Sequence, residues 1–448
     1  MAPIFRCRQP PRLTARYACD NTCCRYLKTG GWLTMDGTRD ARLREPELFR
    51  QGAFRLAAKW WVDGDLRAGE PQVKRLREFA QAEDPLADAV VALFHEMPQG
   101  HGRRLFERAL AEGLDALDDP PEPLVAFFRS VESPPYWLDT ERLERGARAI
   151  TRTGLLGLFP LGDMSLMGGY LASRATKSLV GTGEIEYRSG RRLVETATWW
   201  IDVTTPGSLA PGERGHTSAL RVRIVHAHVR AAMNRRDDWD YEAWDRPVNQ
   251  VQTTGTLLLF SLVFVFGTQL LGVRYTERER ADILHLWRYV GWLMGVDDEL
   301  LPASEPDAWR LLWLLAATEF IPDEDSKRLA KALLRSHEEV GHGRGAVGKV
   351  LSHVSVRVHS SISRLVLGRD NADYLGLPND PVAQGVVLAA AAANFAAETV
   401  RRRVPGATLL AERLGHAGRR TYVARLGRIF DTDRTYAQHM RTGPSRAV

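Results

Sequence analysis

The sequence predicts an all-α protein, organised as a single large helical domain. Apolar residues recur at the three- and four-residue spacings of a helical face along most of the 448-residue chain, and the alternating runs typical of strands are almost absent. A hydrophobic content of 44% and a charged content of 26% are typical of a soluble globular protein, and this length allows a sizeable core. No internal repeat of solenoid length is visible in the sequence, which argues against a repeat architecture.

The first predicted helices are amphipathic and are separated by proline, glycine or aspartate turns. They span Leu43–Val62, Pro85–Glu96, Gly102–Leu117, Leu124–Val131 and Thr140–Arg152. A more apolar stretch from Gly154 to Val180 follows, and Pro160 and several glycines interrupt it. Two motif-bearing helices come next. The helices predicted beyond them span Thr276–Met294, Glu305–Thr318, Asp323–Val340, Lys349–Leu367, Pro381–Arg403 and Arg419–Ile429.

The segment Val251–Val273 runs for more than twenty residues without a charge, which meets the length criterion for a membrane span. The alternative is a helix that is apolar all round because it lies in the centre of a large helical domain. Polar and glycine residues interrupt the run, and the flanking charges show no clear sidedness. We therefore expect a buried core helix. We also interpret the alanine-rich segment Val386–Ala397 as tight helix packing rather than a membrane element.

Charge and cysteine usage narrow the class of protein. The formal net charge of +6 comes from arginines that are scattered along helices and interleaved with acids, so no nucleic-acid partner is expected. The four cysteines all lie in the first two dozen residues, at Cys7, Cys19, Cys23 and Cys24. They do not meet zinc-site spacing, because no histidine lies near them and no second cysteine pair follows. A body without cysteine is also not a disulfide-stapled secreted fold.

The N-terminal segment differs from the rest of the chain. Residues 1–34 are rich in proline, arginine and threonine without periodicity, and Met35 begins a more ordinary protein start. We expect residues 1–34 to be a disordered extension or a misassigned upstream start, and residues 35–448 to form the helical domain. No apolar stretch of secretory-signal length follows the early arginines, so we expect a cytoplasmic protein without stable membrane insertion.

The most informative segments are two helices predicted at Arg191–Val203 and Ser218–Asn234. One face of the second helix consists of Val222, Val225, His226, Val229 and Met233, and arginines flank it. An imidazole on an apolar face is either a hydrogen-bonded core residue or a ligand for something bound there, and its chemistry leaves both open. His228 lies about 200° around the helix from His226, so it cannot share the same ligand.

The first of these helices places two polar residues on one face. Arg192 and Thr196 lie four residues apart, and residues at that spacing are neighbours on a helix surface. The plain alternative is an arginine that pairs with Glu195 or Glu184 and a threonine that bonds to its own helix. The spacing is equally compatible with both interpretations.

Several strings occur in a fixed order across this region. They are RRLVETATWW, LRVRIVHAHVR, DRPVNQ and LHLWRYVGWLMGVDDELLP. In this order they resemble the superfamily that joins latex-clearing proteins (rubber oxygenases) with MpaB-type oxygenases. The resemblance extends from about Pro46 to the helix near Arg403, and its most specific stretch runs from Arg191 to Pro302.

The resemblance implies an all-helical fold with a globin-like core and one b-type haem. By the same resemblance, His226 would bind the haem iron, and Arg192 and Thr196 would maintain the haem pocket. Dioxygen would be the co-substrate, and a small apolar, isoprenoid-like molecule would be oxidised or cleaved at a double bond. A haem- or apolar-ligand-binding protein without turnover is the alternative, and a small helical membrane protein is a third possibility that depends on Val251–Val273.

The resemblance also implies a carboxylate that acts as a base near the bound substrate. Glu184 and Glu186 are candidates by position, although both lie in a loop-like stretch, TGEIEYRSG, where solvated acids are common. The aromatic residues around the motifs could line a pocket or belong to the ordinary core. They are Trp199, Trp200, Phe260, Phe264, Trp287 and Trp292.

Two other patterns carry no functional prediction. His337 and His342 are spaced almost as in zinc-protease motifs, but they lie five residues apart instead of four and cannot share a zinc ion on one helix face. The run Gly341–Gly345 resembles a phosphate-binding loop, yet no strand precedes it and no lysine-serine pair follows. We expect the end of a helix and a turn there.

Overall fold

The computed structural model describes residues 43, 45–61, 65–182, 185–341 and 345–430. These residues form helices joined by turns, with no β-strand among them, so the all-α prediction is confirmed. Residues 1–34, predicted to be an extension or a misassigned start, lie outside the described part of the chain.

The α-helices, in chain order, are α2 (Glu47–Arg50), α3 (Gly52–Trp61), α4 (Glu70–Phe79), α5 (Pro85–Glu96), α6 (His101–Glu112), α7 (Glu122–Glu132), α8 (Thr140–Thr151), α9 (Leu158–Pro160), α10 (Met167–Gly169), α11 (Ser173–Gly181), α12 (Ile185–Val203), α13 (Arg214–Asn234), α14 (Tyr241–Trp244), α15 (Gln250–Phe260), α16 (Leu262–Leu270), α17 (Glu277–Leu293), α18 (Glu305–Thr318), α19 (Glu324–Glu339), α20 (Gly345–Leu367), α21 (Arg369–Tyr374), α22 (Pro381–Arg401) and α23 (Ala407–Ile429). Short 3-10 turns η1 (Leu114–Ala116), η2 (Gly154–Gly157) and η4 (Asp298–Leu300) and a π-helix η3 (Leu161–Leu166) complete the described elements.

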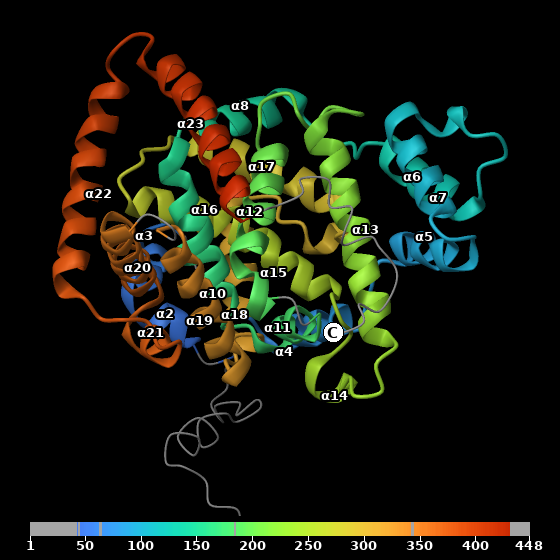
Figure 1. The fold of residues 1–448 in the computed structure, drawn as a ribbon, viewed down its shortest axis with the longest axis horizontal. Coiled ribbons are helices and arrows are strands. Elements are labelled where there is room, and N and C mark those ends of the chain that lie inside the picture. Colours follow the sequence, from blue (N-terminus) through green and yellow to red (C-terminus); the bar gives the residue numbers. More distant parts are fainter. Residues whose placement is uncertain (1–42, 44, 62–64, 183–184, 342–344, 431–448) are drawn as a thin grey trace, which may run out of the picture.

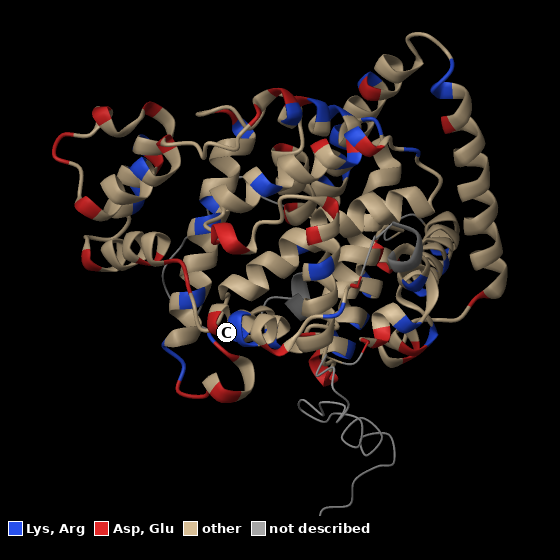
Figure 2. Ribbon diagram, turned by 180° about the vertical axis from the view of Figure 1, so that it is seen from behind, with Lys and Arg blue, Asp and Glu red and all other residues tan. Residues whose placement is uncertain are grey.

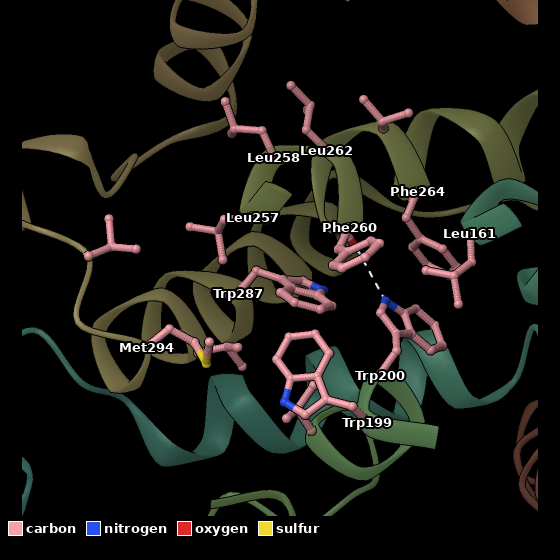
Figure 3. Packing of buried hydrophobic residues seen from close by; sticks show 14 of the residues in the cluster. Leu161, Trp199, Trp200, Leu257, Leu258, Phe260, Leu262, Phe264, Trp287 and Met294 are labelled. Atoms are coloured by element: carbon pink, nitrogen blue, oxygen red, sulfur yellow. Dashed lines mark hydrogen bonds between the residues drawn. The ribbon is translucent and has the colours of Figure 1, made fainter. Parts of the chain in front are cut away.

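The centre of the molecule is built from α12, α13, α15, α16 and α17, with α5, α6 and α7 grouped at one side and α22 at the opposite edge (Figure 1). Large aromatic side chains meet between the central helices (Figure 3). Trp200 and Trp287 are each only 1% exposed, and the indole N–H of Trp200 donates to the carbonyl oxygen of Phe260 at 3.5 Å. This cluster is part of a continuous apolar core whose burial stabilises the fold.

The apolar run predicted as a core helix is indeed buried, but it forms two helices. The chain breaks at Ser261, whose hydroxyl donates to the carbonyl oxygen of Leu257 at 2.7 Å and so competes with the regular backbone bonding of the helix. Of the most apolar window in α15 and α16, 72% is buried inside the protein. Length and composition alone would allow this segment to cross a membrane, and its burial assigns it to the core.

The stretch predicted as one interrupted segment from Gly154 to Val180 is irregular. It passes through η2, α9, the π-helix η3 and α10 before α11 begins, and the path turns by 99° between its two halves. Pro160 lacks a backbone N–H, which favours a change of hydrogen-bond pattern directly after it. Gly267 of α16 lies against this segment, and a Cβ there would fall 2.1 Å from the sulfur of Met164. The π-helix therefore packs directly against the backbone of α16 at Gly267, which has no side chain.

The hairpin of α22 and α23 corrects one expectation. The alanine-rich segment Val386–Ala397 was predicted to pack tightly, yet only 17% of the most apolar window in α22 is buried. Val382 and Val386 are 70% and 60% exposed, because α22 contacts the body along one narrow side only. By length and composition α22 is the second described segment that could cross a membrane.

Charged residues are distributed along most of the described elements, and α22 is nearly free of them (Figure 2). Many arginines pair with acids of neighbouring helices, as between Arg75 and Glu299 or Arg280 and Glu305. Acidic and basic residues thus alternate between neighbouring helices of the described part of the chain.

Candidate active site

A cavity of about 330 Å³ lies between α11, α12, α13, α15, α17 and the π-helix η3. Its wall is mostly aliphatic and aromatic, with few polar groups, and it falls in the size range of small-molecule sites, roughly 300–1,000 Å³. The three cofactor residues predicted from the sequence, His226, Arg192 and Thr196, all line it. Tertiary packing has thus brought the two motif helices to a common space.

His226 faces this cavity from α13. Among the described residues neither of its ring nitrogens has a hydrogen-bond partner, so the interpretation as a hydrogen-bonded core histidine is not supported. Burial lowers the pKa of its imidazole to about 4, and the positive charges of Arg230 and Arg192 act in the same direction. The ring is therefore neutral at physiological pH and presents a free nitrogen lone pair to an apolar space.

Arg192 and Thr196 reach the cavity from α12. The sequence left open a salt bridge between Arg192 and Glu195. In the structure Arg191 makes this contact instead, with its Nε 2.9 Å from the carboxylate of Glu195. No carboxylate within the described side chains pairs with Arg192. Thr198 bonds back to its own helix at 2.7 Å, whereas no such bond to the described backbone is found for Thr196. The guanidinium and the hydroxyl are therefore both available to a bound group.

His228 lies on the far side of α13, as its spacing from His226 predicted. Its ring is buried against Phe94 and His95 of α5, at centroid distances of 5.7 and 6.2 Å. Burial lowers the pKa of His228 to about 4. It does not line the cavity and has no role in the site.

Two buried arginines on α13 fix the helix against α5. Arg223 contacts the carboxylate of Asp84 through Nε at 2.6 Å and through Nη2 at 2.9 Å. Arg230 bonds to Asp88 at 2.8 Å and to the carbonyl oxygen of Val248 at 2.7 Å. These two arginines of the motif therefore meet their anionic partners within the protein, on α5 or in the turn before it.

Comparison with known proteins identifies the family. Residues 151–398, more than half of the chain, match the family described as "ER-bound oxygenase mpaB/B'/Rubber oxygenase, catalytic domain". The chain belongs to this family. The match begins at the end of α8 and ends in α22, so it includes every helix that lines the cavity. The chain therefore carries an enzyme's catalytic domain, as the strings in the sequence indicated.

Individual relatives of the family are distant. The chain is 23% identical over 293 residues to a rubber oxygenase of Streptomyces sp. (strain K30), and this alignment covers 63% of the chain and 66% of the relative, just under two thirds of its length. The solved structure of latex clearing protein LCP in the closed state superposes with a TM-score of 0.57 at 20% identity, covering 84% of this chain and 96% of that one. At this identity the likeness establishes the fold.

The carboxylates that line the cavity differ from those predicted. Glu184 lies outside the described residues, and Glu186 lies in α12, which begins at Ile185, so the prediction of a loop was wrong for Glu186. Its side chain is not described. The cavity is lined instead by Glu195 and Glu319.

Glu195 could have been found from the sequence, because it lies three residues after Arg192 and hence on a neighbouring part of the same helix face. Glu319 lies just beyond the C-terminus of α18 and carried no comparable signal. It is held by Arg174 at 3.5 Å and by Arg77 at 3.4 Å, both far away in the sequence.

The aromatic residues divide between the site and the core. Trp199, Phe260 and Trp287 line the cavity, whereas Trp200 and Phe264 are buried behind it. The indole N–H groups of Trp199 and Trp287 are buried without a hydrogen-bond partner among the described atoms. Trp292 stacks on Tyr289 outside the cavity wall, with ring centroids 5.6 Å apart. For an oxygenase of this family, the wall therefore offers an apolar slot with a small number of unsatisfied donors.

Proposed function

We propose that this protein is a haem b-dependent oxygenase that uses dioxygen to oxidise or cleave a double bond of a small apolar, isoprenoid-like substrate. The observation that carries the proposal is the placement of His226, a neutral imidazole without a partner among the described residues, on the wall of an apolar cavity that Arg192 and Thr196 also line. Family membership supports the oxygenase class.

The residues present fit a haem. A b-type haem needs an axial nitrogen, an apolar slot for its ring and donors for its propionates. His226 offers the nitrogen, the aliphatic and aromatic wall offers the slot, and the guanidinium of Arg192 is a donor suited to a carboxylate. When bound, the haem supplies a redox-active iron at which dioxygen is activated.

The remaining tasks fall to the chain itself. The apolar wall excludes water and holds an apolar substrate by burying its surface. Val225 and Val229 of α13 lie within one turn of His226 and line the same space, so they shape it close to the imidazole. The hydroxyl of Thr196 is a second polar group on that wall, one turn from Arg192, and can orient a bound polar atom.

Proton transfer requires a group at the cavity wall that can accept a proton. We assign this role to the carboxylate of Glu195, because it lies on the same helix as Arg192 and Thr196 and lines the cavity. An oxygen of its carboxylate would take the allylic proton of the substrate, and Arg191 at 2.9 Å holds the carboxylate in place. Glu319 is the second carboxylate of the wall, held by two arginines.

The cofactor assignment is tested by the absorption spectrum of the purified protein. We expect a Soret band that His226→Ala loses or shifts, while His228→Ala leaves it unchanged. Both histidines are buried on the same helix, so the second variant controls for the loss of an imidazole. In His226→Gly, added imidazole should restore the band. A wild-type spectrum retained in His226→Ala would contradict the assignment.

Turnover is tested by oxygen uptake and by mass spectrometry of products formed from short isoprenoid alkenes. We expect aldehyde or ketone products, and we expect Glu195→Gln to reduce their rate by about 10²-fold or more while the Soret band stays unchanged. Glu319→Gln is the matched control from the same wall. Stable haem binding without oxygen uptake on any alkene would favour the alternative, a haem-binding protein without turnover.

A further inference from the structure

A second group of chemically active side chains lies outside the cavity wall. Asp163 of the π-helix η3, His337 of α19 and His359 of α20 come together, and their ligand atoms all lie within 4.8 Å of one another. Nδ1 of His359 is 2.8 Å from one carboxylate oxygen of Asp163 and 2.9 Å from the other. Nε2 of His337 is 3.9 Å from the carboxylate. None of the three lines the cavity that contains His226.

Asp163 and His337 are buried, His359 is partly exposed, and no lysine or arginine of the described residues supplies a compensating charge. Asp163 is 1% exposed, and no lysine or arginine in the described part of the chain pairs with it. Burial raises the pKa of Asp163 well above its usual value, and burial lowers the pKa of His337 to about 3 and that of His359 to about 4. A buried carboxyl group is costly in its charged form unless a cation lies beside it, and a bound metal ion would supply that charge.

His337 supplies an independent sign of a binding role. The residue is only 5% exposed, and its Nε2 has no hydrogen-bond partner among the described atoms. The ring lies parallel to that of His359, with centroids 3.6 Å apart and planes 10° apart. Burying a donor or acceptor without a partner is costly, so such a group in a native protein calls for a ligand or another partner.

The local backbone supports a binding role. Asp163 lies in a π-helix, a rare conformation that occurs frequently at functional sites because it redirects a side chain. Ser165 and Leu166 of the same π-helix line the cavity wall. A ligand that ties Asp163 to α19 and α20 would therefore also fix the position of that wall.

We propose that Asp163, His337 and His359 bind one divalent transition-metal ion, with zinc as the best match. Two imidazoles and one carboxylate form a common three-residue ligand set for such ions, and a fourth position remains for water. Bond lengths of about 2.0–2.1 Å place tetrahedral ligand atoms about 3.3 Å apart, within the spread of 2.8 to 3.9 Å seen between Asp163 and the two histidines.

The proposed ligands produce no local sequence motif because they come from three separate helices. His337 and His342 were excluded as a metal-binding pair within a single segment, and His342 lies outside the described residues. The partner of His337 is instead His359, which the packing of α19 against α20 brings alongside it. This site is separate from the proposed haem site and does not depend on it.

The test is metal analysis of the full-length protein after dialysis against a weak chelator and after addition of zinc chloride. We expect one zinc ion per chain in the wild type, with loss of tight zinc binding in His359→Ala and in Asp163→Asn. His353→Ala is the matched control, because His353 is exposed on the same helix, and it should retain zinc. A wild type that binds no stoichiometric zinc, cobalt or manganese at micromolar concentrations would overturn the proposal.

X-ray absorption at the zinc edge of the wild type makes the result independent of variant folding. We expect a shell of nitrogen and oxygen atoms at about 2.0–2.1 Å with imidazole scattering. Sulfur ligands at about 2.3 Å would assign the zinc to the cysteines near the N-terminus and would overturn the proposal. Because zinc and iron are counted separately, failure of the haem assignment would not affect this outcome.

Discussion

The buried ion pair between Arg223 and Asp84 gives the sharpest stability prediction. The side chains are 6% and 9% exposed, and two charge-assisted hydrogen bonds of 2.6 and 2.9 Å join them. Arg223→Met keeps most of the apolar stem and removes the charge, which leaves the Asp84 carboxylate buried without its partner. Breaking such a pair costs about 3–5 kcal/mol.

This cost converts to a measurable change in melting temperature. Unfolding entropy of about 2.1 cal/mol/K per residue gives about 0.8 kcal/mol/K for roughly 400 residues, so the expected fall in melting temperature is about 4–6 °C. Differential scanning calorimetry of the protein without cofactor measures it. The double-mutant cycle with Asp84→Asn isolates the pairwise contribution.

A matched control lies on the same helix. Arg221 pairs with Glu107 at 2.9 Å, but these side chains are 29% and 30% exposed, so Arg221→Met should cost no more than about 1 kcal/mol. If Arg223→Met lowers the melting temperature no more than Arg221→Met does, the buried ion pair with Asp84 contributes no more to stability than the exposed pair with Glu107, and the prediction is refuted.

Three further outcomes are expected. Burial lowers the pKa of His228 to about 4 from an ordinary value near 6.5, so the unfolded chain binds this proton more readily than the folded one. The free energy of unfolding should therefore fall as the pH drops from 6.5 to 4. Guanidinium titrations measure this fall, which should be smaller in His228→Phe. Gly291→Ala should lower the free energy of unfolding by about 1–3 kcal/mol, because its Cβ would lie 2.6 and 2.7 Å from two leucine methyl groups. The control Gly255→Ala meets only one contact, at 3.9 Å, and should leave stability nearly unchanged. Thermal unfolding of the two variants measures the difference. We also predict a cytoplasmic protein that is at most peripherally attached to membranes. Val386→Lys and Leu388→Lys, at exposed positions of α22, should reduce any such attachment in cell fractionation. Recovery of the protein only with detergent would contradict this prediction.

The site could be predicted in part because its key residues lie on two helices close together in the sequence. Periodicity placed His226 on an apolar face and His228 on the other, and the structure agrees. The roles of Arg192 and Thr196 came from the family resemblance, since spacing alone allowed ordinary helix-surface contacts. Glu319 could not be predicted, because its position in the wall depends on Arg77 and Arg174 from distant helices.

Local sequence determined which segments of this protein are helical, because helix formation depends on periodic apolar residues, caps and breakers within a short window. The start of α5 at Pro85 follows from Asp84 as a cap and Pro85 in the first turn, and both are visible in the sequence. The break at Ser261 and the π-helix around Asp163 were not predicted, although the Ser261 hydroxyl and Pro160 favour them locally, because a serine or a proline in an apolar run does not by itself specify either feature.

Exposure and long-range proximity were decided by the tertiary structure alone. The segments Val251–Val273 and Val386–Ala397 are both uncharged and largely apolar, yet the first is buried among the central helices and much of the second faces outward. Composition indicates how favourable the burial of an apolar side chain is. Only the arrangement of the other helices decides whether there is a surface against which that side chain can be buried. The same reason hid the cluster of Asp163, His337 and His359, whose members are close in space only because three helices pack together.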